Sequence, residues 1–221
     1  MSKEETIFGD DWPYSKAKSS LLRSAAIVMR EEGPRAATLK NIAAKAGVTE
    51  PAIFRHFDGV DGMFQSLFDV VEMFFDLFQL YYKEAGHVGL DRFENAYFKI
   101  LAALKENVDF CYLLTQPDAI FRQYPKLRQR LAELKARDKD SVVACIKEAK
   151  SKGQLVAGAD AETVAMSVVG ATLLAINSWV ADVGASDIVK EGKRVWNGVR
   201  ALVSNPDWKP AAKAKAAPRK K

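Results

Sequence analysis

Side chains that could bind an anionic partner gather in one short stretch of the chain. Lys45 and Arg55 are long enough to reach phosphates or a guanine edge, and Lys40 is a weaker candidate of the same kind. Thr38 and Thr49 stand where two helices are expected to begin, and the free N–H groups of a helix N-terminus also favour phosphate. The chemistry that this set can perform is the binding of duplex nucleic acid.

The residues between these positions could read base edges. Glu50 can accept a hydrogen bond from a cytosine amino group, and Pro51 and Ala52 offer apolar contact to a thymine methyl. Phe54 and His56 complete the candidate set. We expect His56 to contact the nucleic-acid backbone or to pack as a ring, rather than to act as a titrating switch.

Two short helices joined by a tight turn must position these side chains. Thr38 can N-cap the first helix, Gly47 can take the positive φ that ends it, and Thr49 can N-cap the second. Ile42 and Ile53 are apolar where two crossing helices must touch. The pattern predicts a helix-turn-helix.

This stretch resembles a known DNA-binding domain. Residues 38–46, the Gly47-Val48-Thr49 turn and the segment 54–57 resemble the DNA-binding domain of the TetR family of bacterial repressors, and the specific likeness covers about residues 20–63. The resemblance implies a dimeric transcriptional regulator. Such a regulator has an N-terminal domain that reads DNA and a larger helical domain that dimerises and usually binds a small effector.

Three positions depart from what this family usually shows. Phe54 stands where a tyrosine would give its hydroxyl to a phosphate, Ala52 where a threonine is common, and Val60 where a lysine usually follows the recognition helix. Each change removes a polar partner for DNA, at about 1 kcal/mol for a net hydrogen bond. The departures favour weakened DNA binding, or binding that depends partly on other basic segments.

Positive charge is local rather than general. The 221 residues carry a net charge of +5, but residues 209–221 contribute +6 with no acid, so residues 1–208 sum to 5 − 6 = −1. Residues 16–57 hold eight basic and three acidic side chains, a balance of +5 that suits a phosphate-facing module. We expect residues 209–221 to be a disordered basic tail, either merely solvated or adding sequence-independent affinity for DNA.

Composition predicts an all-α protein of about nine helices. Hydrophobic residues make up 48% of the chain, glycine and proline are few, and no long run alternates as a strand would. Four segments are expected. They are a flexible arm at 1–15, the helix-turn-helix domain at 16–62, a helical effector-binding and dimerisation domain at 63–208, and the basic tail at 209–221.

The sequence favours a cytoplasmic protein. Cys111 and Cys145 lie in helical patterns without paired spacing, as expected of reduced core thiols. The N-terminal residues lack a basic segment followed by an apolar one, so no signal peptide is expected. Residues 163–181 contain no charge and approach the length of a membrane span, but they include six polar or glycine positions, and a buried helix of a soluble dimer looks the same.

The second domain contains enough apolar and aromatic surface to line a cavity between helices. No interior run within it supplies several charges, so the expected effector is apolar or aromatic with one or two polar groups, and its identity does not follow from the sequence. Most of these side chains also suit an ordinary core. The candidate pocket residues are Phe68, Phe74, Phe78, Tyr97, Leu101, Phe110, Tyr112, Phe121, Cys145, Met166 and Asn177.

Two C-terminal helices are apolar around much of their circumference, so one face could cover the core and another could meet a partner copy. With the same pair from a second chain they would form the four-helix dimer interface that the resemblance implies. A dimer would present two recognition helices to a palindrome. The expected interface residues are Val169, Gly170, Leu173, Trp179, Val195, Trp196 and Val199.

Two other functional classes compete with this hypothesis. Catalysis is disfavoured because the chain has two histidines, no metal-ligand spacing, no G-x-S-x-G and no phosphate-binding glycine loop; no metal or cofactor is expected. The alternative is a helical dimeric interaction or sensor module that no longer uses its helix-turn-helix, which the three departures favour. The preferred hypothesis is a regulator, most simply a repressor, that binds operator DNA as a homodimer and is released by a small effector.

Overall fold

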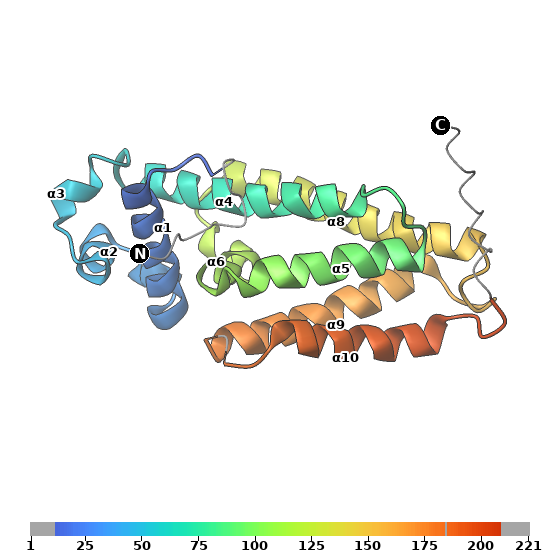
Figure 1. Ribbon diagram of the computed structural model, residues 1–221. Coiled ribbons are helices and arrows are strands. Elements are labelled where there is room, and N and C mark those ends of the chain that lie inside the picture. The colour runs from blue at the N-terminus through green and yellow to red at the C-terminus, as the bar shows by residue number, and fades with distance from the viewer. Residues whose placement is uncertain (1–11, 184, 209–221) are drawn as a thin grey trace, which may run out of the picture.

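The described part of the chain folds into α-helices joined by short connections (Figure 1). The computed structural model describes residues 12–183 and 185–208. Within them it has ten α-helices, two of them single turns, where about nine were expected, and no strand beyond an isolated bridge between Leu155 and Ser204. The helices are α1 (Lys16–Glu32), α2 (Leu39–Ala46), α3 (Glu50–Ile53), α4 (Gly59–Tyr82), α5 (Leu90–Lys105), α6 (Val108–Thr115), α7 (Pro117–Ile120), α8 (Pro125–Ser151), α9 (Ala161–Ala181) and α10 (Ile188–Val203), with a 3-10 turn, η2, at Pro34–Ala36.

Local capping explains where the first helices begin and end. The Ser15 side chain accepts a hydrogen bond from the backbone N–H of Lys18 at the start of α1, and Thr38 does the same for Asn41 at the start of α2. Gly47 ends α2 in the left-handed region at φ 68°, a conformation that costs glycine little. These two predicted features of the helix-turn-helix, the Thr38 cap and the Gly47 turn, are confirmed.

The long helix α4 connects the two parts of the molecule. It begins at Gly59, so the boundary expected between residues 62 and 63 falls inside its first turn. Its N-terminal end lies beside α1 to α3, and its remaining length packs against α5 and α8 (Figure 1). A displacement of α4 along its axis would therefore change its contacts both with the helix-turn-helix end and with the helical bundle.

Large aromatic side chains fill the core of the second part. Phe68 meets Phe121 edge to face with ring centroids 5.1 Å apart, and Phe93 lies 4.9 Å from Trp196. All four side chains are fully buried. Because α10 supplies Trp196 while α5 supplies Phe93, these contacts fasten the last helix to the bundle, and α9 packs alongside both α10 and α8.

One described helix, α9 (Ala161–Ala181), is long and apolar enough to cross a membrane by length and composition alone. In this structure it packs against α6, α8 and α10. Its buried face covers the core, and its other face carries the exposed apolar residues described below.

Hydrogen bonds hold both ends of the described chain to neighbouring segments. Trp12 donates its indole N–H to the Ser19 hydroxyl at 2.6 Å, and Tyr14 donates its hydroxyl to Asp69 at 2.9 Å, so this end of the expected flexible arm is held against α1 and α4. At the other end the backbone N–H of Asn205 donates to the Gln154 carbonyl at 2.8 Å, away from α2 and α3 (Figure 1). Residues 1–11 and the predicted basic tail at 209–221 lie outside the described residues.

Candidate nucleic-acid interface

The ten residues expected to contact DNA lie on α2, on α3 and in the turns that flank α3. Eight of them are exposed, and Ala52 and His56 are partly buried. Ile42 from α2 and Ile53 from α3 are buried beneath them at 1% and 0% exposure. The apolar side of the helix-turn-helix is thus anchored in the core, and its polar side faces solvent.

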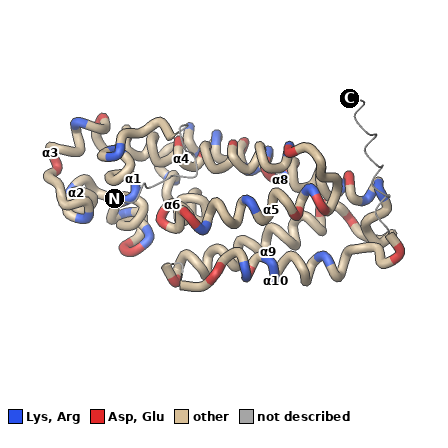
Figure 2. The backbone as a smooth tube through the Cα atoms, viewed as in Figure 1, with Lys and Arg blue, Asp and Glu red and all other residues tan. Residues whose placement is uncertain are grey.

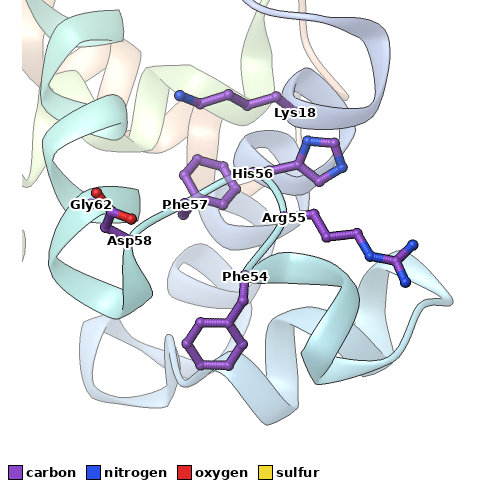
Figure 3. Close-up of a pocket in the computed structure, with 7 residues that line it drawn as sticks. All are labelled: Lys18, Phe54, Arg55, His56, Phe57, Asp58 and Gly62. Atoms are coloured by element: carbon purple, nitrogen blue, oxygen red, sulfur yellow. The ribbon is translucent and has the colours of Figure 1, made fainter.

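The recognition helix is short in this structure. The α-helix α3 spans four residues, Glu50–Ile53, and turn hydrogen bonds continue it: the backbone N–H groups of His56 and Phe57 both donate to the Ile53 carbonyl, at 2.9 and 3.1 Å. Phe57 is buried at 5% exposure and closes the segment against the core. Arg55 stands on the exposed side of this turn and extends away from the helices (Figure 3).

The two threonines differ in how they use their side chains. Thr38 accepts from the Asn41 N–H at 3.2 Å, which leaves its hydroxyl proton free to donate. Thr49 has the extended backbone of an N-cap, but its side chain makes no capping hydrogen bond, so the expected side-chain cap is not formed. The free Thr49 hydroxyl is the better placed of the two to donate to a phosphate at the start of α3.

An ion pair restrains one of the candidate basic residues. The Lys45 ammonium lies 2.6 Å from a carboxylate oxygen of Glu31 on α1. The Lys45 hydrogen bond holds the pKa of Glu31 below its usual value, so this carboxylate stays ionised. Lys45 therefore faces solvent with part of its charge offset, whereas Lys40 has no ion-pair partner among the described residues.

A basic hollow lies beside the recognition segment, residues 50–57, which comprises α3 and the turn after it (Figure 3). It encloses about 310 Å³ and is lined by Lys18, Phe54, Arg55, His56, Phe57, Asp58 and Gly62. Lys18, on α1, was not among the expected contact residues. Its ammonium lies 5.0 Å from the centroid of the Phe57 ring and 4.5 Å from that of Tyr14, which places a cation at the hollow. The local excess of basic residues was the only sequence signal for it, and Figure 2 shows the basic positions at this end of the molecule.

Phe54 is the most conspicuous departure at this surface. Its ring is 58% exposed, although an apolar ring normally gains by burial. It carries no hydroxyl with which to donate to a phosphate. The position is therefore open to DNA but offers only apolar contact.

A largely buried ion-pair cluster joins this domain to the second one. Asp109, in the first turn of α6, accepts from Arg23 at 3.0 Å and from Arg30 at 3.1 Å, both on α1. The Arg30 side chain is 8% exposed and that of Asp109 17%. Because α6 also packs on α9, it connects the DNA-facing domain to the C-terminal helices.

Most of the residues expected to line an effector pocket are packed in the core. Eight of them are buried: Phe68, Phe74, Phe78, Tyr97, Leu101, Phe110, Phe121 and Cys145. The Tyr97 hydroxyl shares a 2.9 Å hydrogen bond with Thr172 and donates to the Gly192 carbonyl at 3.1 Å, and burial raises its pKa. Burial also raises the pKa of the Cys145 thiol to about 11, so this thiol stays protonated.

Three of the expected pocket residues lie elsewhere. Met166 is 65% exposed on the outer face of α9, so the structure removes it from a pocket inside the bundle. Asn177, half-buried on α9, accepts from the Gln116 amide at 3.1 Å, and Tyr112 is half-buried on α6. The helical pattern alone could not separate the outer face of α9 from its inner face, because the helix is apolar on both.

The expected dimer residues also divide between surface and core. Gly170 and Leu173 are exposed on α9, with Leu173 at 45%, and Val169, Val195 and Val199 are partly exposed. Trp179 and Trp196, at 3% and 0%, are corrected to core residues, because their indoles pack within their own chain. Leu174, at 70%, and Leu202, at 80%, are more exposed neighbours outside the expected set.

The metal-ligating and nucleophilic side chains of the described residues are dispersed or buried. Within residues 12–183 and 185–208, no group of three or more His, Cys, Asp or Glu side chains is placed to hold a metal ion. Cys111 is buried, with its thiol donating to the Leu104 and Asn107 carbonyls, and burial raises its pKa far above the usual range. A buried thiol that stays protonated is a poor nucleophile.

Comparison with known proteins agrees with the geometry of the interface. Residues 21–67 match the family model described as "Bacterial regulatory proteins, tetR family". The chain is 25% identical over 187 residues to the HTH-type transcriptional repressor BepR of Brucella suis, covering 82% of this chain and 88% of BepR. It is 26% identical over 137 residues to the nucleoid occlusion factor SlmA of Marinomonas sp., covering 61% of this chain and 68% of SlmA.

The fold is shared with solved structures of regulators. The ketosteroid transcriptional regulator KstR2 of Mycobacterium tuberculosis superposes with a TM-score of 0.75 at 16% identity, covering 87% of this chain and 97% of KstR2. SmeT, the repressor of the Stenotrophomonas maltophilia multidrug efflux pump SmeDEF, superposes with a TM-score of 0.61 at 18% identity, covering 91% and 97%. Residues 21–67 thus match the tetR family of bacterial regulatory proteins, and most of the chain aligns with BepR and shares its fold with these solved regulators.

Proposed function

We propose that this protein is a cytoplasmic, homodimeric repressor that binds operator DNA through α2 and α3 and is released by a small-molecule effector. The observation that carries the proposal is the exposed polar face of the helix-turn-helix, anchored from below by Ile42 and Ile53. BepR and SmeT, by their names, are repressors. The likeness to them extends over most of this chain.

Phosphate contacts position the protein on DNA in this proposal. Arg55 and Lys40 are exposed cations at the α2–α3 face, and Lys18 adds a third at the hollow beside the turn. The Thr49 hydroxyl and the backbone N–H of Glu50 supply neutral donors, since Pro51 has no N–H and the Ala52 N–H donates to the Thr49 carbonyl. Bases are read by Glu50, Pro51 and Ala52.

A dimer is proposed through the outer faces of α9 and α10. Leu174 and Met166 on α9 are 70% and 65% exposed, and Leu202 on α10 is 80% exposed. Apolar side chains of this size gain free energy by leaving water, so a partner copy that covers them is stabilised. Two recognition segments related by a two-fold axis suit a palindromic operator with half-sites about 34 Å apart.

The proposed effector acts in the second domain. It changes the relative position of the recognition segments through α4, which runs from the helix-turn-helix into the bundle, and through α6, whose Asp109 holds Arg23 and Arg30 of α1. A ligand with equal affinity for the free and the DNA-bound dimer would shift nothing. Release therefore requires that the effector bind the free dimer more tightly.

A second candidate function is a helical dimeric sensor or interaction module with weakened DNA binding. The exposed Phe54 ring favours it, because an apolar ring replaces a phosphate donor at the interface. The two candidates differ in one measurable property, which is the ratio of operator affinity to affinity for unrelated DNA.

The test is fluorescence anisotropy on DNA from upstream of the protein's own gene, against scrambled DNA, over a salt series. We expect at least about a hundredfold preference for the upstream DNA, and Arg55→Ala should reduce it. Lys126→Ala, which removes an exposed charge at the start of α8, is the matched control and should leave affinity unchanged. Equal, purely salt-dependent binding to both DNAs that becomes a preference for the upstream DNA once Ala52, Phe54 and Val60 are changed to Thr, Tyr and Lys would favour the second candidate. Equal binding that persists after these changes would mean that the operator lies elsewhere.

A further inference from the structure

A lone carboxylate interrupts the apolar inner face of α8. Asp138 lies one turn after Leu134 and one turn before Val142, which are 8% and 1% exposed. Side chains four residues apart share a helix face, so Asp138 points along the same stripe as these two core residues. A charged side chain therefore occupies a position on a helix face that is otherwise apolar.

The described residues compensate this charge only weakly: Asp138 is partly buried, and the adjacent Arg137 offsets part of its charge without binding it. The Asp138 Oδ1 atom is buried and accepts no hydrogen bond, and Asp138 forms no ion pair with any residue of 12–183 or 185–208. The adjacent Arg137 turns outward, where its guanidinium binds Asp76 of α4 at 2.6 Å. A buried carboxylate without a partner is costly, which is why buried polar groups without a partner are rare in native proteins.

The facing side of α4 carries a second unpaired group. Gln79, 7% exposed, accepts a 2.8 Å hydrogen bond from the Ser141 hydroxyl of α8, one turn beyond Asp138. Its amide nitrogen is buried and donates to nothing. An unused acceptor on α8 and an unused donor on α4 therefore lie at the same level of the α4–α8 contact.

Aromatic residues flank Gln79 along α4. Tyr82, one turn after Gln79, is buried, and the nearby charge of Asp138 adds to the burial that raises its pKa. Phe78 is also buried, 6.2 Å from the Phe74 ring centroid and 6.0 Å from that of Phe75. A cation between such rings gains attraction to their faces, and an anion does not.

We infer that the effector is an organic cation, an amine on an apolar or aromatic body, whose ammonium pairs with Asp138 between α4 and α8. This inference rests on the proposed function and names the ligand class of the same effector domain. An ammonium N–H supplies the donor that Oδ1 lacks, and an oxygen on the ligand can accept from the Gln79 amide. The weakly compensated charge of Asp138 repels carboxylates and phosphates from the same place.

Three probes with one skeleton separate the charge from the apolar body. 4-Phenylbutylamine, 4-phenyl-1-butanol and 4-phenylbutyrate differ only in the terminal group, which is cationic, neutral or anionic. Tetraphenylphosphonium serves as a bulkier second cation. Binding is measured by calorimetry and by the thermal shift of the full-length protein, without DNA.

The wild-type protein should bind a cation and gain thermal stability, while the alcohol and the carboxylate bind at least about tenfold more weakly. Asp138→Asn should lose at least about tenfold in cation affinity, and Asp138→Glu should retain most of it. Asp140→Asn removes the same charge from an exposed position on α8 and should bind like the wild type. Circular dichroism of each variant confirms that it is folded.

Three outcomes would overturn the inference. They are equal cation binding by wild type and Asp138→Asn, tighter binding of the alcohol or the carboxylate, and no binding of either cation at millimolar concentration. Operator anisotropy of the same variants without a probe is a separate readout. No preference for operator DNA by the wild type in that assay would count against the proposed function and leave the cation measurement to stand on its own.

Discussion

The Arg30 guanidinium lies 3.1 Å from the Asp109 carboxylate, and both side chains are largely buried at the contact between α1 and α6. Arg23 donates to the other oxygen of the same carboxylate at 3.0 Å. One acidic side chain of the second domain therefore holds two basic side chains of the DNA-facing domain. The cluster thus adds an electrostatic link to the apolar packing of α1.

Asp109→Asn should destabilise the protein by about 3 kcal/mol, because it removes the closer and more buried of the two carboxylates that pair with Arg30 and leaves only Glu31, at 3.5 Å. Urea unfolding at neutral pH measures this loss. Asp118→Asn is the control: Asp118 pairs with Lys135 at an exposed site, where a pair is worth about 0.5 kcal/mol. Equal losses for both variants would mean that the cluster does not stabilise the contact between the domains.

Glu31→Gln should strengthen DNA binding by about twofold at low salt, because it releases the Lys45 ammonium from its ion pair and removes a nearby negative charge. Anisotropy on operator DNA across a salt series measures the change. Glu32→Gln removes the same charge from an exposed neighbour without freeing Lys45. If both variants gain equally, the effect is general electrostatics and the Lys45 ion pair plays no part.

Phe54→Tyr should tighten operator binding by about 1 kcal/mol per subunit, because the new hydroxyl can donate to a phosphate from a side chain that is already 58% exposed. The free energy of unfolding should stay within about 0.5 kcal/mol of the wild type. Phe54→Leu, which changes the ring but adds no donor, should not tighten binding. A gain shared equally with scrambled DNA would show that position 54 does not face the operator backbone.

The helix-turn-helix could be predicted because its signals are local. The contacts between distant segments could not be predicted from the sequence. The Thr38 cap and the positive φ of Gly47 depend on neighbours within a few residues, so the sequence was sufficient for them. Asp109 meets Arg30 across 79 positions, and Lys18 reaches the hollow beside Arg55 from another helix. Neither contact produces a periodic pattern from which the sequence could predict it.

The faces of apolar helices were the second source of error. Because α9 is apolar almost all round and α10 carries apolar residues on more than one side, periodicity could not say that Trp196 is fully buried while Leu174 is 70% exposed. Asp138 shows the same difficulty in reverse, since a charged residue in a long charged helix is normally assigned to its solvent face. Only the packing of α4 on α8 reveals its burial.

Leu174→Arg should convert a dimer into monomers, because it places a charge in the centre of the exposed apolar face of α9. Size-exclusion chromatography with light scattering measures the mass, and operator affinity should fall with it. Leu80→Arg is a matched control at 64% exposure on α4, away from α9, and should leave the mass unchanged. A Leu174→Arg protein of unchanged mass would place the interface elsewhere.

Asp138→Asn should stabilise the protein at neutral pH. Burial raises the pKa of Asp138 from 3.8 to about 6, so the native state binds the proton more tightly than the unfolded chain. The stability of the wild type should therefore fall as the pH rises from about 4 to about 6, by up to about 3 kcal/mol, and the penalty should persist above that range. The asparagine has no proton to lose, so its unfolding free energy should lack this fall, and the two proteins should converge near about pH 4.

Urea unfolding across this pH range, with Asp140→Asn as the exposed control, measures the difference. Parallel curves for wild type and Asp138→Asn would show that the carboxylate finds a partner in solution and is not held available for a ligand.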